Sequence, residues 1–469
     1  MSAREPVNEE QAMERLHEGS TRRQFLQAAG FGAAAVAVGG GALAATRGAG
    51  RAVAQATAVS ARDRVVLTGG NILLAATDGY MTVPGREDDP LYIFGFIPVS
   101  NDPVATLEND FKGRAQHIAP ILDTTDGTDV YLKLTNLGLI QRPDLTDSHT
   151  LHWHGFRTPT SLFDGVPEVS IAVPINRQFT YFYRPHNVGT YMYHCHFEDV
   201  EHVQMGMTSI VFVRPNGHPN WAYNDSSTEF DRHFAILLNE VWNKFHDGDR
   251  DIQESIPTDY DPQWFTLNGR CYPHTVLPND DPALPADLRL VTANANNADD
   301  EASQPVSALV QVNPGDRVLL RLANLGYLQH SMELPGIPLR VVGQDATFLG
   351  PGTSLGVTYA DRRYMTNTVY IGPGEARDVL FTAPDYDGDA PTFADTWGTY
   401  NRYFFRNRDY RKLANNGDRG GGGPNGAIAG LGGMASEVRV YEPGASGTPL
   451  PAPTPDSAGR ISPNLTYVR

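Results

Sequence analysis

One of the two cysteines in this 469-residue chain lies between two histidines, in the stretch GTYMYHCHFEDVEHVQMGM at 189–207. Thiolate and imidazole groups are strong ligands for transition metals, and a methionine thioether is a weaker one. His202 and Met207 follow Cys195 within this single stretch. Residues of these types, so close together, predict a metal site around Cys195.

A second histidine cluster lies upstream, with the sequence SHTLHWHG at 148–155. Side chains at i and i+2 of an extended strand point to one face, and the residue between them points to the other. The HWH and HCH motifs therefore each place two imidazoles on one face of a strand, while Cys195 faces the opposite way. The predicted imidazole site contains His152, His154, His194 and His196.

The predicted thiolate site has the ligand set of a blue-copper centre, which combines one cysteine, two histidines and a weak axial methionine. The candidate ligands are His149, Cys195, His202 and Met207. Met205 is an alternative axial ligand. Zinc is the alternative metal, but zinc sites rarely include methionine, and structural zinc sites usually contain more than one cysteine.

The rest of the chain supplies short strand-like segments, such as DVYLKLTNL at 129–137, FTYFYRP at 179–185 and EVRVYEP at 437–443. Long helical periodicities are scarce, and 46 glycines and 34 prolines supply many turns. This composition predicts an all-β fold. The formal net charge of −17 argues against a nucleic-acid partner.

The two halves of the chain contain similar segments in the same order. Three pairs align without gaps: 127–141 with 315–329, 189–196 with 398–405, and 204–213 with 431–440. Such a repeat predicts two copies of one β-rich domain. The expected domains are 57–222, which carries the candidate ligands, and 223–445, followed by a C-terminal tail at 446–469.

The second copy lacks most of the candidate ligands. In the alignment, the histidines of SHTLHWHG correspond to His330, Glu333 and Pro335, and the HCH motif corresponds to Tyr403, Phe404 and Phe405. His202 corresponds to Ala429, and Met207 to Met434. We therefore expect a second domain without copper, in which aromatic side chains fill the ligand space.

The N-terminal segment resembles an export signal. Paired arginines in STRRQFLQ at 20–27 precede a short apolar Ala/Gly run at 28–45. This pattern is typical of the twin-arginine route, which carries folded proteins to the periplasm or the exterior. Residues 1–56 are therefore expected to form the signal and leader, and no membrane span is expected in the mature chain.

The motifs HWHG, DGVPEVSIAVPI at 164–175, and GTYMYHCH followed by H-x-x-x-G-M resemble the multicopper oxidase superfamily. The resemblance covers most of the mature chain and implies two tandem cupredoxin-like Greek-key β-sandwich domains. It also implies type 1 copper at His149, Cys195, His202 and Met207. The other four clustered histidines, His152, His154, His194 and His196, would serve a second copper site.

This chain departs from the oxidase pattern in its second half, which has no H-x-H pair and offers His330 as its best-placed ligand. We therefore expect one or two further copper ions in place of a complete trinuclear cluster. The chain also resembles the copper nitrite reductases, which are trimers with a copper site shared between subunits. That resemblance favours a homo-oligomer, with a trimer as the expected form.

These observations predict a copper-dependent oxidoreductase, in which type 1 copper accepts electrons from a reducing substrate and the His-Cys-His link passes them to a second copper site. The reductant would be a small molecule, a metal ion or a redox protein. Two alternatives remain at this stage: a non-enzymatic electron-transfer cupredoxin, and a nitrite reductase-like enzyme.

Overall fold

The computed structural model describes residues 59–86, 89–252, 256–279, 303–354, 357–416, 431–444 and 449–467. The expected twin-arginine segment, 1–56, lies outside these residues. None of the helices in the described part of the chain is long and apolar enough to cross a membrane.

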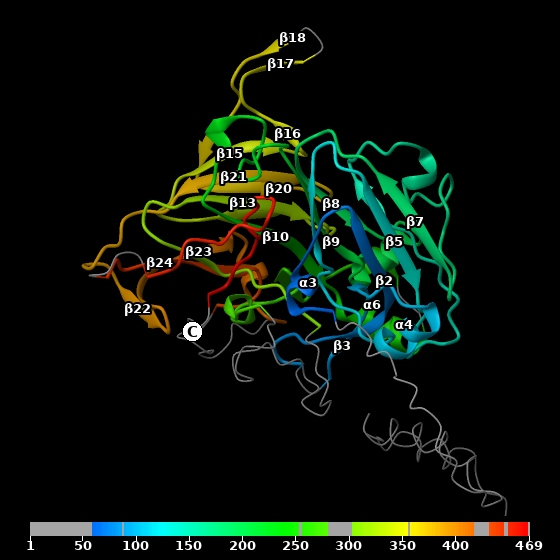
Figure 1. Ribbon diagram of the computed structural model, residues 1–469. Coiled ribbons are helices and arrows are strands. Elements are labelled where there is room, and N and C mark those ends of the chain that lie inside the picture. The colour runs from blue at the N-terminus through cyan, green and yellow to red at the C-terminus, as the bar shows by residue number, and fades with distance from the viewer. Residues whose placement is uncertain are drawn as a thin grey trace, which may run out of the picture. The chain divides into compact units, whose positions relative to one another are not determined.

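Two sheets take all of their strands from residues 66–214 (Figure 1). One sheet has the order β1-β4-β9-β8-β6, and the other has the order β3-β2-β5-β7. Their bounds are β1 Val66–Thr68, β2 Asn71–Met81, β3 Leu91–Pro98, β4 Ile121–Thr125, β5 Val130–Asn136, β6 His152–His154, β7 Gln178–Tyr183, β8 Gly189–His194 and β9 Thr208–Arg214.

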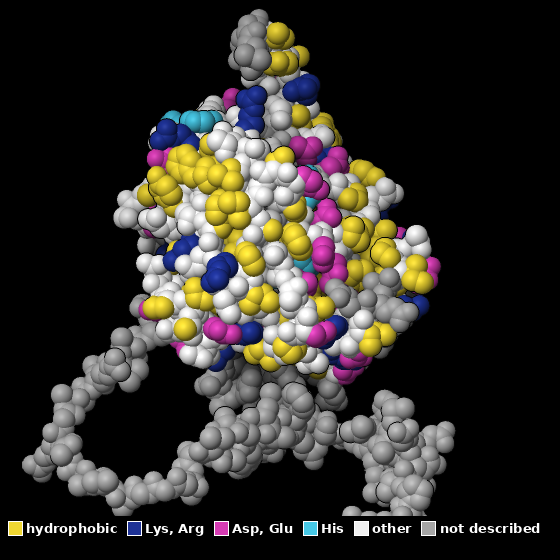
Figure 2. Space-filling view, turned by 90° about the vertical axis from the view of Figure 1, so that its right-hand side faces the viewer, with side chains coloured by type: hydrophobic (Ala, Val, Ile, Leu, Met, Phe, Trp, Pro, Cys, Tyr) yellow, Lys and Arg dark blue, Asp and Glu magenta, His cyan; other side chains and the backbone are white. Residues whose placement is uncertain are grey.

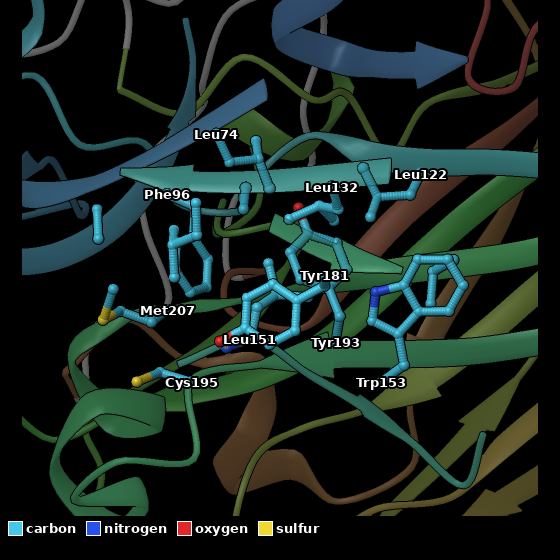
Figure 3. Packing of buried hydrophobic residues seen from close by; sticks show 14 of the residues in the cluster. Leu74, Phe96, Leu122, Leu132, Leu151, Trp153, Tyr181, Tyr193, Cys195 and Met207 are labelled. Carbon is cyan, nitrogen blue, oxygen red and sulfur yellow. Dashed lines mark hydrogen bonds between the residues drawn. The ribbon is translucent and has the colours of Figure 1, made fainter. Parts of the chain in front are cut away.

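An apolar core lies between these two sheets. Leu74, Leu132 and Tyr181 come from one sheet, and Trp153 and Tyr193 come from the other; all five are fully buried. Along β5 the burial alternates at first, as expected for strands with one face on a core. Figure 3 shows this core, with Cys195 and Met207 at one end of it. The candidate metal ligands Cys195 and Met207 therefore lie at the edge of the β-sandwich.

The remaining sheets take their strands from residues 232–441. One has the order β11-β10-β13-β21-β15-β16, with β19 beside β15; another has the order β12-β24-β23-β14-β20, with β22 beside β23. Strands β17 and β18 form a projecting hairpin (Figure 1). The bounds are β10 Arg232–Val241, β11 Trp264–Leu267, β12 Val310–Val312, β13 Arg317–Asn324, β14 His330–Glu333, β15 Leu339–Gln344, β16 Thr347–Phe348, β17 Gly352–Ser354, β18 Val357–Tyr359, β19 Tyr364–Thr366, β20 Thr368–Ile371, β21 Ala376–Thr382, β22 Thr392–Asp395, β23 Gly398–Asn407 and β24 Ala435–Tyr441.

Helices in the described residues are short. They are α3 Ala61–Val65, α4 Val104–Phe111, α5 Asp199–Met205 and α6 Asn243–Asp251, with 3-10 turns η1 Ser161–Phe163, η2 Ser226–Thr228, η3 Pro257–Asp259, η4 His274–Val276 and η5 Tyr410–Leu413. The predicted all-β class and sandwich architecture are confirmed. Each sheet draws its strands from one side of residue 222, while the domain boundaries themselves stay predictions.

The register of the second half corrects one part of the ungapped alignment. The amide of Cys195 donates to the carbonyl of Met207 at 3.1 Å, and the amide of Asn407 donates to the carbonyl of Met434 at 3.0 Å. Asn407 therefore occupies the position of Cys195, not Phe404. The reason is that β23 has 10 residues and β8 has 6. Phe405 instead packs into the apolar core of the second half.

Candidate metal centre

The first predicted site is assembled around the sulfur of Cys195. Its Sγ lies 3.2 Å from Nδ1 of His202 and 3.9 Å from Nδ1 of His149. The three ligand atoms lie within 4.8 Å of one another, and all three residues are buried. The Thr150 amide also points at Sγ, at 3.4 Å. The sequence interpretation of these three residues as one group agrees with the geometry.

Met207 closes the same loop from its far end. It is fully buried, and its amide donates to the carbonyl of His202 at 3.0 Å. Figure 3 shows the Cys195 and Met207 side chains at the same end of the core. Met205, the alternative axial residue, is also buried, as the last residue of α5. The choice of Met207 as axial ligand remains a prediction.

Helix α5 positions His202, and its end needs a glycine. The helix is capped by Gly206, which has a φ of 118° and donates back to the carbonyls of His202 and Val203. A Cβ at Gly206 would lie 3.0 Å from both Nδ1 of His117 and the carbonyl oxygen of Phe94. Only glycine combines this conformation with such a close approach. The short helix therefore returns the chain to β9 directly after presenting His202.

Burial keeps the donor atoms of this group in defined protonation states. Burial lowers the pKa of His202 to about 3, and burial together with His202 lowers the pKa of His149. Burial also raises the pKa of the Cys195 thiol to about 12. Neutral imidazoles are ready to ligate, whereas the thiol needs a metal cation to favour its thiolate form. The donor set fits copper, with soft sulfur and two imidazole nitrogens.

The second predicted site lies where β6 pairs with β8. His152 is the register partner of His194. Nε2 of His194 lies 3.4 Å from Nδ1 of His154, and the ligand atoms of His152, His154 and His194 lie within 4.8 Å of one another. His196 lies beside them, with its ring centroid 5.1 Å from that of His152.

Hydrogen bonds orient two of these imidazoles. Nδ1 of His152 donates to the carbonyl of Asp164 at 2.6 Å, and Nδ1 of His194 donates to the carbonyl of Cys195 at 2.7 Å. In both rings Nε2 remains as the potential ligand atom. Burial lowers the pKa of His194 to about 3. Three neutral imidazoles that converge in this way fit a copper ion.

The described residues of the second half add backbone, not histidine, to this cluster. A Cβ on Gly374 would lie 3.1 Å from Nε2 of His154, so the turn before β21 packs directly on that ring. His330, the best-placed second-half ligand in the sequence, bonds to Glu240 instead, and two further histidines also have other partners: His233 bonds to Ile461 and His246 to Tyr92. Among the described residues, none of the groups that could hold a metal ion combines these histidines with His152, His154 and His194.

An acidic pocket that sequence reasoning missed lies beside His202. It encloses about 420 Å³ and is lined by Glu198, Asp199, Val200, Glu201, Phe245, Asp249 and Pro257. Ligand atoms of Asp147, Glu201 and His202 also lie within 4.8 Å of one another. Nε2 of His202 and Oδ2 of Asp147 are buried without a hydrogen-bond partner. The face of His202 turned away from Cys195 thus meets carboxylates.

Two carboxyl groups, Asp249 in the wall of this pocket and Asp147 beside Glu201, lie in poorly solvated places. Burial, followed by the charge of Glu201, raises the pKa of Asp249 to about 8. Burial, followed by the charge of Glu198, raises the pKa of Asp147 to about 6. A cation near these carboxyl groups would favour their charged forms and so lower both pKa values. Asp147 could have been suspected from its place just before SHTLHWHG, but α6 comes from a distant part of the sequence.

Comparisons with known proteins agree with this geometry. Residues 113–218 match the family described as multicopper oxidase. Laccase-5 of Arabidopsis thaliana is 26% identical over 304 residues, which cover 63% of this chain and 41% of that protein. Putative laccase-11 of Oryza sativa subsp. japonica is 25% identical, over 62% of this chain and 44% of that protein. The chain spans less than half the length of these curated relatives.

Solved structures share the fold. Blue copper oxidase from Nitrosomonas europaea aligns with a TM-score of 0.53 at 20% identity, over 80% of this chain and 86% of that chain. A multicopper oxidase called mgLAC aligns with the same TM-score, identity and coverage. This likeness establishes the cupredoxin-like sandwich architecture.

Proposed function

We propose that this member of the multicopper oxidase superfamily is a copper-dependent oxidoreductase that takes electrons from a small reductant at a type 1 site. The observation that carries the proposal is the position of Cys195. Its Sγ belongs to the His149–Cys195–His202 group, while its backbone joins it directly to His194 and His196. Copper at both groups would supply one-electron redox chemistry.

The chain's own residues would hold and connect the two sites. His149, Cys195, His202 and axial Met207 would hold type 1 copper. His152, His154, His194 and His196 would hold one or two further copper ions. The β6–β8 pairing places His152 beside His194, and Cys195 follows His194 directly at the end of β8. A rigid frame of this kind limits reorganisation when a redox state changes.

The acidic pocket indicates which reductants fit. The carboxylates of this pocket would attract a cation and hold it close to His202, one of the candidate type 1 ligands. Acidic side chains also gather in a band on the face shown in Figure 2, and the chain carries a net charge of −17. We therefore favour a cationic substrate, such as a reduced metal ion, over an anionic one or a protein with an acidic surface.

The second site takes only part of its ligands from one chain. Three or four imidazoles come from this chain, and the described residues of its second half add no further histidine. A neighbouring subunit in a closed homo-oligomer, a trimer being the expected form, would complete the site. We further infer domains at 57–222 and 223–445, and export of the folded chain by the twin-arginine route to the periplasm or the exterior.

Copper analysis and turnover together test this function. Purified, copper-loaded protein should be blue, contain two or three coppers per chain by the ligand count above, and show both type 1 and non-type 1 signals by electron paramagnetic resonance. Oxygen uptake with a reductant should accompany these signals. One copper per chain and no turnover would favour the alternative of an electron carrier, and nitrite-dependent turnover without oxygen uptake would favour the reductase alternative.

A further inference from the structure

The backbone around the first metal site has two hydrogen bonds that fix where its ligands lie. The amide of Cys195 donates to the carbonyl of Met207 at 3.1 Å, and the amide of Met207 donates to the carbonyl of His202 at 3.0 Å. Together they bring the thiol residue, the loop histidine and the axial methionine to one place.

The second half of the chain repeats both hydrogen bonds. The amide of Asn407 donates to the carbonyl of Met434 at 3.0 Å, and the amide of Met434 donates to the carbonyl of Lys412 at 2.8 Å. Asn407 thus occupies the cysteine position, Met434 the methionine position, and Lys412 the position of His202. The sequence alignment gave Ala429 for that last position, which this geometry corrects.

Strand pairing supplies the fourth correspondence. His152 pairs with His194 in the first half, and Glu333 pairs with Arg406 in the second. His152 and Glu333 are therefore equivalent, and the residues three positions before them are His149 and His330. All four ligand positions of the first site therefore have an identified counterpart: His330, Asn407, Lys412 and Met434.

The counterparts converge in the same way as the ligands. Nδ1 of His330 lies 3.2 Å from Nδ2 of Asn407 and 3.3 Å from Nζ of Lys412. Nδ2 of Asn407 also lies 3.3 Å from Sδ of Met434. In the first site, Nδ1 of each histidine faces the cysteine sulfur. In the second, Nδ1 of His330 faces an ammonium group instead of a metal.

The charges around Lys412 explain why a cation is kept there. Glu240 is fully buried, and its Oε2 lies 3.0 Å from Nε2 of His330. Nε2 therefore carries the proton, and Nδ1 presents a lone pair to Nζ of Lys412. Nζ also donates to the carbonyl of Gln329 at 2.5 Å. The ammonium offsets the buried carboxylate through the imidazole, as a metal ion at this point would.

We propose that the second half contains a complete copper-site frame in which the Lys412 ammonium stands where a metal ion would bind. The inference rests on the proposed function, because it takes the first frame to be a copper site. It assigns Lys412 a specific role, that of an internal substitute for the metal. It also predicts that two side-chain changes are enough to open a second blue-copper site.

The variant Asn407→Cys/Lys412→His, placed in a Cys195→Ser background, tests this prediction. Cys195→Ser alone should be colourless. The triple variant should regain blue colour and bind one more copper per chain than Cys195→Ser. The matched control, Cys195→Ser/Lys412→His, has no thiol at either site and should stay colourless. With the wild-type protein blue, a folded triple variant that gains neither copper nor colour overturns the inference. A colourless wild-type protein contradicts the proposed function instead.

A second measurement needs neither copper nor colour. In metal-free protein, Lys412→Met keeps the length of the stem but removes the ammonium, and should lower the thermal midpoint because Glu240 then lacks its cation. Adding Glu240→Gln should recover part of that loss. Lys133→Met, on a partly exposed lysine whose partner is the side chain of Asn101, is the control and should leave the midpoint nearly unchanged. Equal midpoints for Lys412→Met and wild type would overturn the role of the ammonium, whatever the colour of the protein.

Discussion

The carbonyl oxygen of Cys195 accepts a hydrogen bond from Nδ1 of His194 at 2.7 Å. One residue thus serves two metal groups: its sulfur belongs to the first, and its carbonyl orients an imidazole of the second. The bond fixes the tautomer of His194 and leaves Nε2 for a ligand role. Changes at Cys195 and at the histidines should consequently have separable effects on the two sites.

Replacing Cys195 with serine should abolish the blue colour and remove one copper per chain, because the thiolate is the ligand that defines a blue-copper site. The serine backbone keeps the carbonyl that orients His194, so non-type 1 copper should remain. Absorption spectroscopy and a copper count check both effects. Cys271→Ser is the control, since Cys271 is buried elsewhere and bonds to the carbonyl of Phe265. Blue colour in the Cys195 variant would contradict the assignment.

His154→Ala should leave the blue colour but remove turnover and part of the copper. Nδ1 of His154 lies 3.4 Å from Nε2 of His194 in the second group, whereas the imidazoles beside the Cys195 sulfur are those of His149 and His202. Oxygen uptake and the copper count are the readouts. His186→Ala changes an exposed histidine and should match wild type in both. Full turnover by the His154 variant would support the electron-carrier alternative.

The HCH and HWH motifs could be placed from the sequence because strand alternation is a local property. The period of two puts His194 and His196 on one face whatever the rest of the chain does. The second-half counterparts could not be placed, because β23 is longer than β8 and residues 415–431 lie between Lys412 and Met434. An alignment without gaps then pairs Cys195 with Phe404, a partly buried aromatic residue.

The acidic pocket was hidden for a different reason. Its walls come from α5 and from α6, which are brought together by tertiary packing. No local pattern marks Phe245 or Asp249 as part of one pocket with Glu201. The sequence did indicate an acidic protein, through its net charge of −17. Only the fold shows that carboxylates gather beside a candidate ligand.

Glu201→Gln should weaken the use of cationic reductants. Its carboxylate lies within the Asp147–Glu201–His202 group, so its loss should raise KM for a reduced metal ion by roughly two- to fivefold, the scale of one partly exposed charge pair. KM for an uncharged phenol should change little. Glu442→Gln, at an exposed position away from the pocket, is the control. Equal increases for both reductants would show that the charge of Glu201 does not select the substrate.

The buried His246 should make the metal-free protein sensitive to acid. Its Nδ1 donates to the carbonyl of Tyr92 at 2.6 Å, and burial lowers its pKa to about 4. Unfolding restores an ordinary pKa of about 6.5, so between these values the unfolded chain binds more protons than the folded one. The contribution of His246 to stability is therefore full above about pH 6.5 and is lost as the pH falls towards 4.

Urea unfolding of metal-free wild type and His246→Asn at pH 7.5 and pH 5.5 measures this contribution. The variant should be less stable at pH 7.5, because it loses buried contacts of the ring. Between pH 7.5 and pH 5.5, the free energy of unfolding of the variant should fall by about 1 kcal/mol less than that of wild type, because one titrating histidine has been removed. Because His246 belongs to neither metal group, the blue colour of copper-loaded protein should persist in the variant. An identical loss of stability in both proteins between the two pH values would show that His246 does not titrate with unfolding.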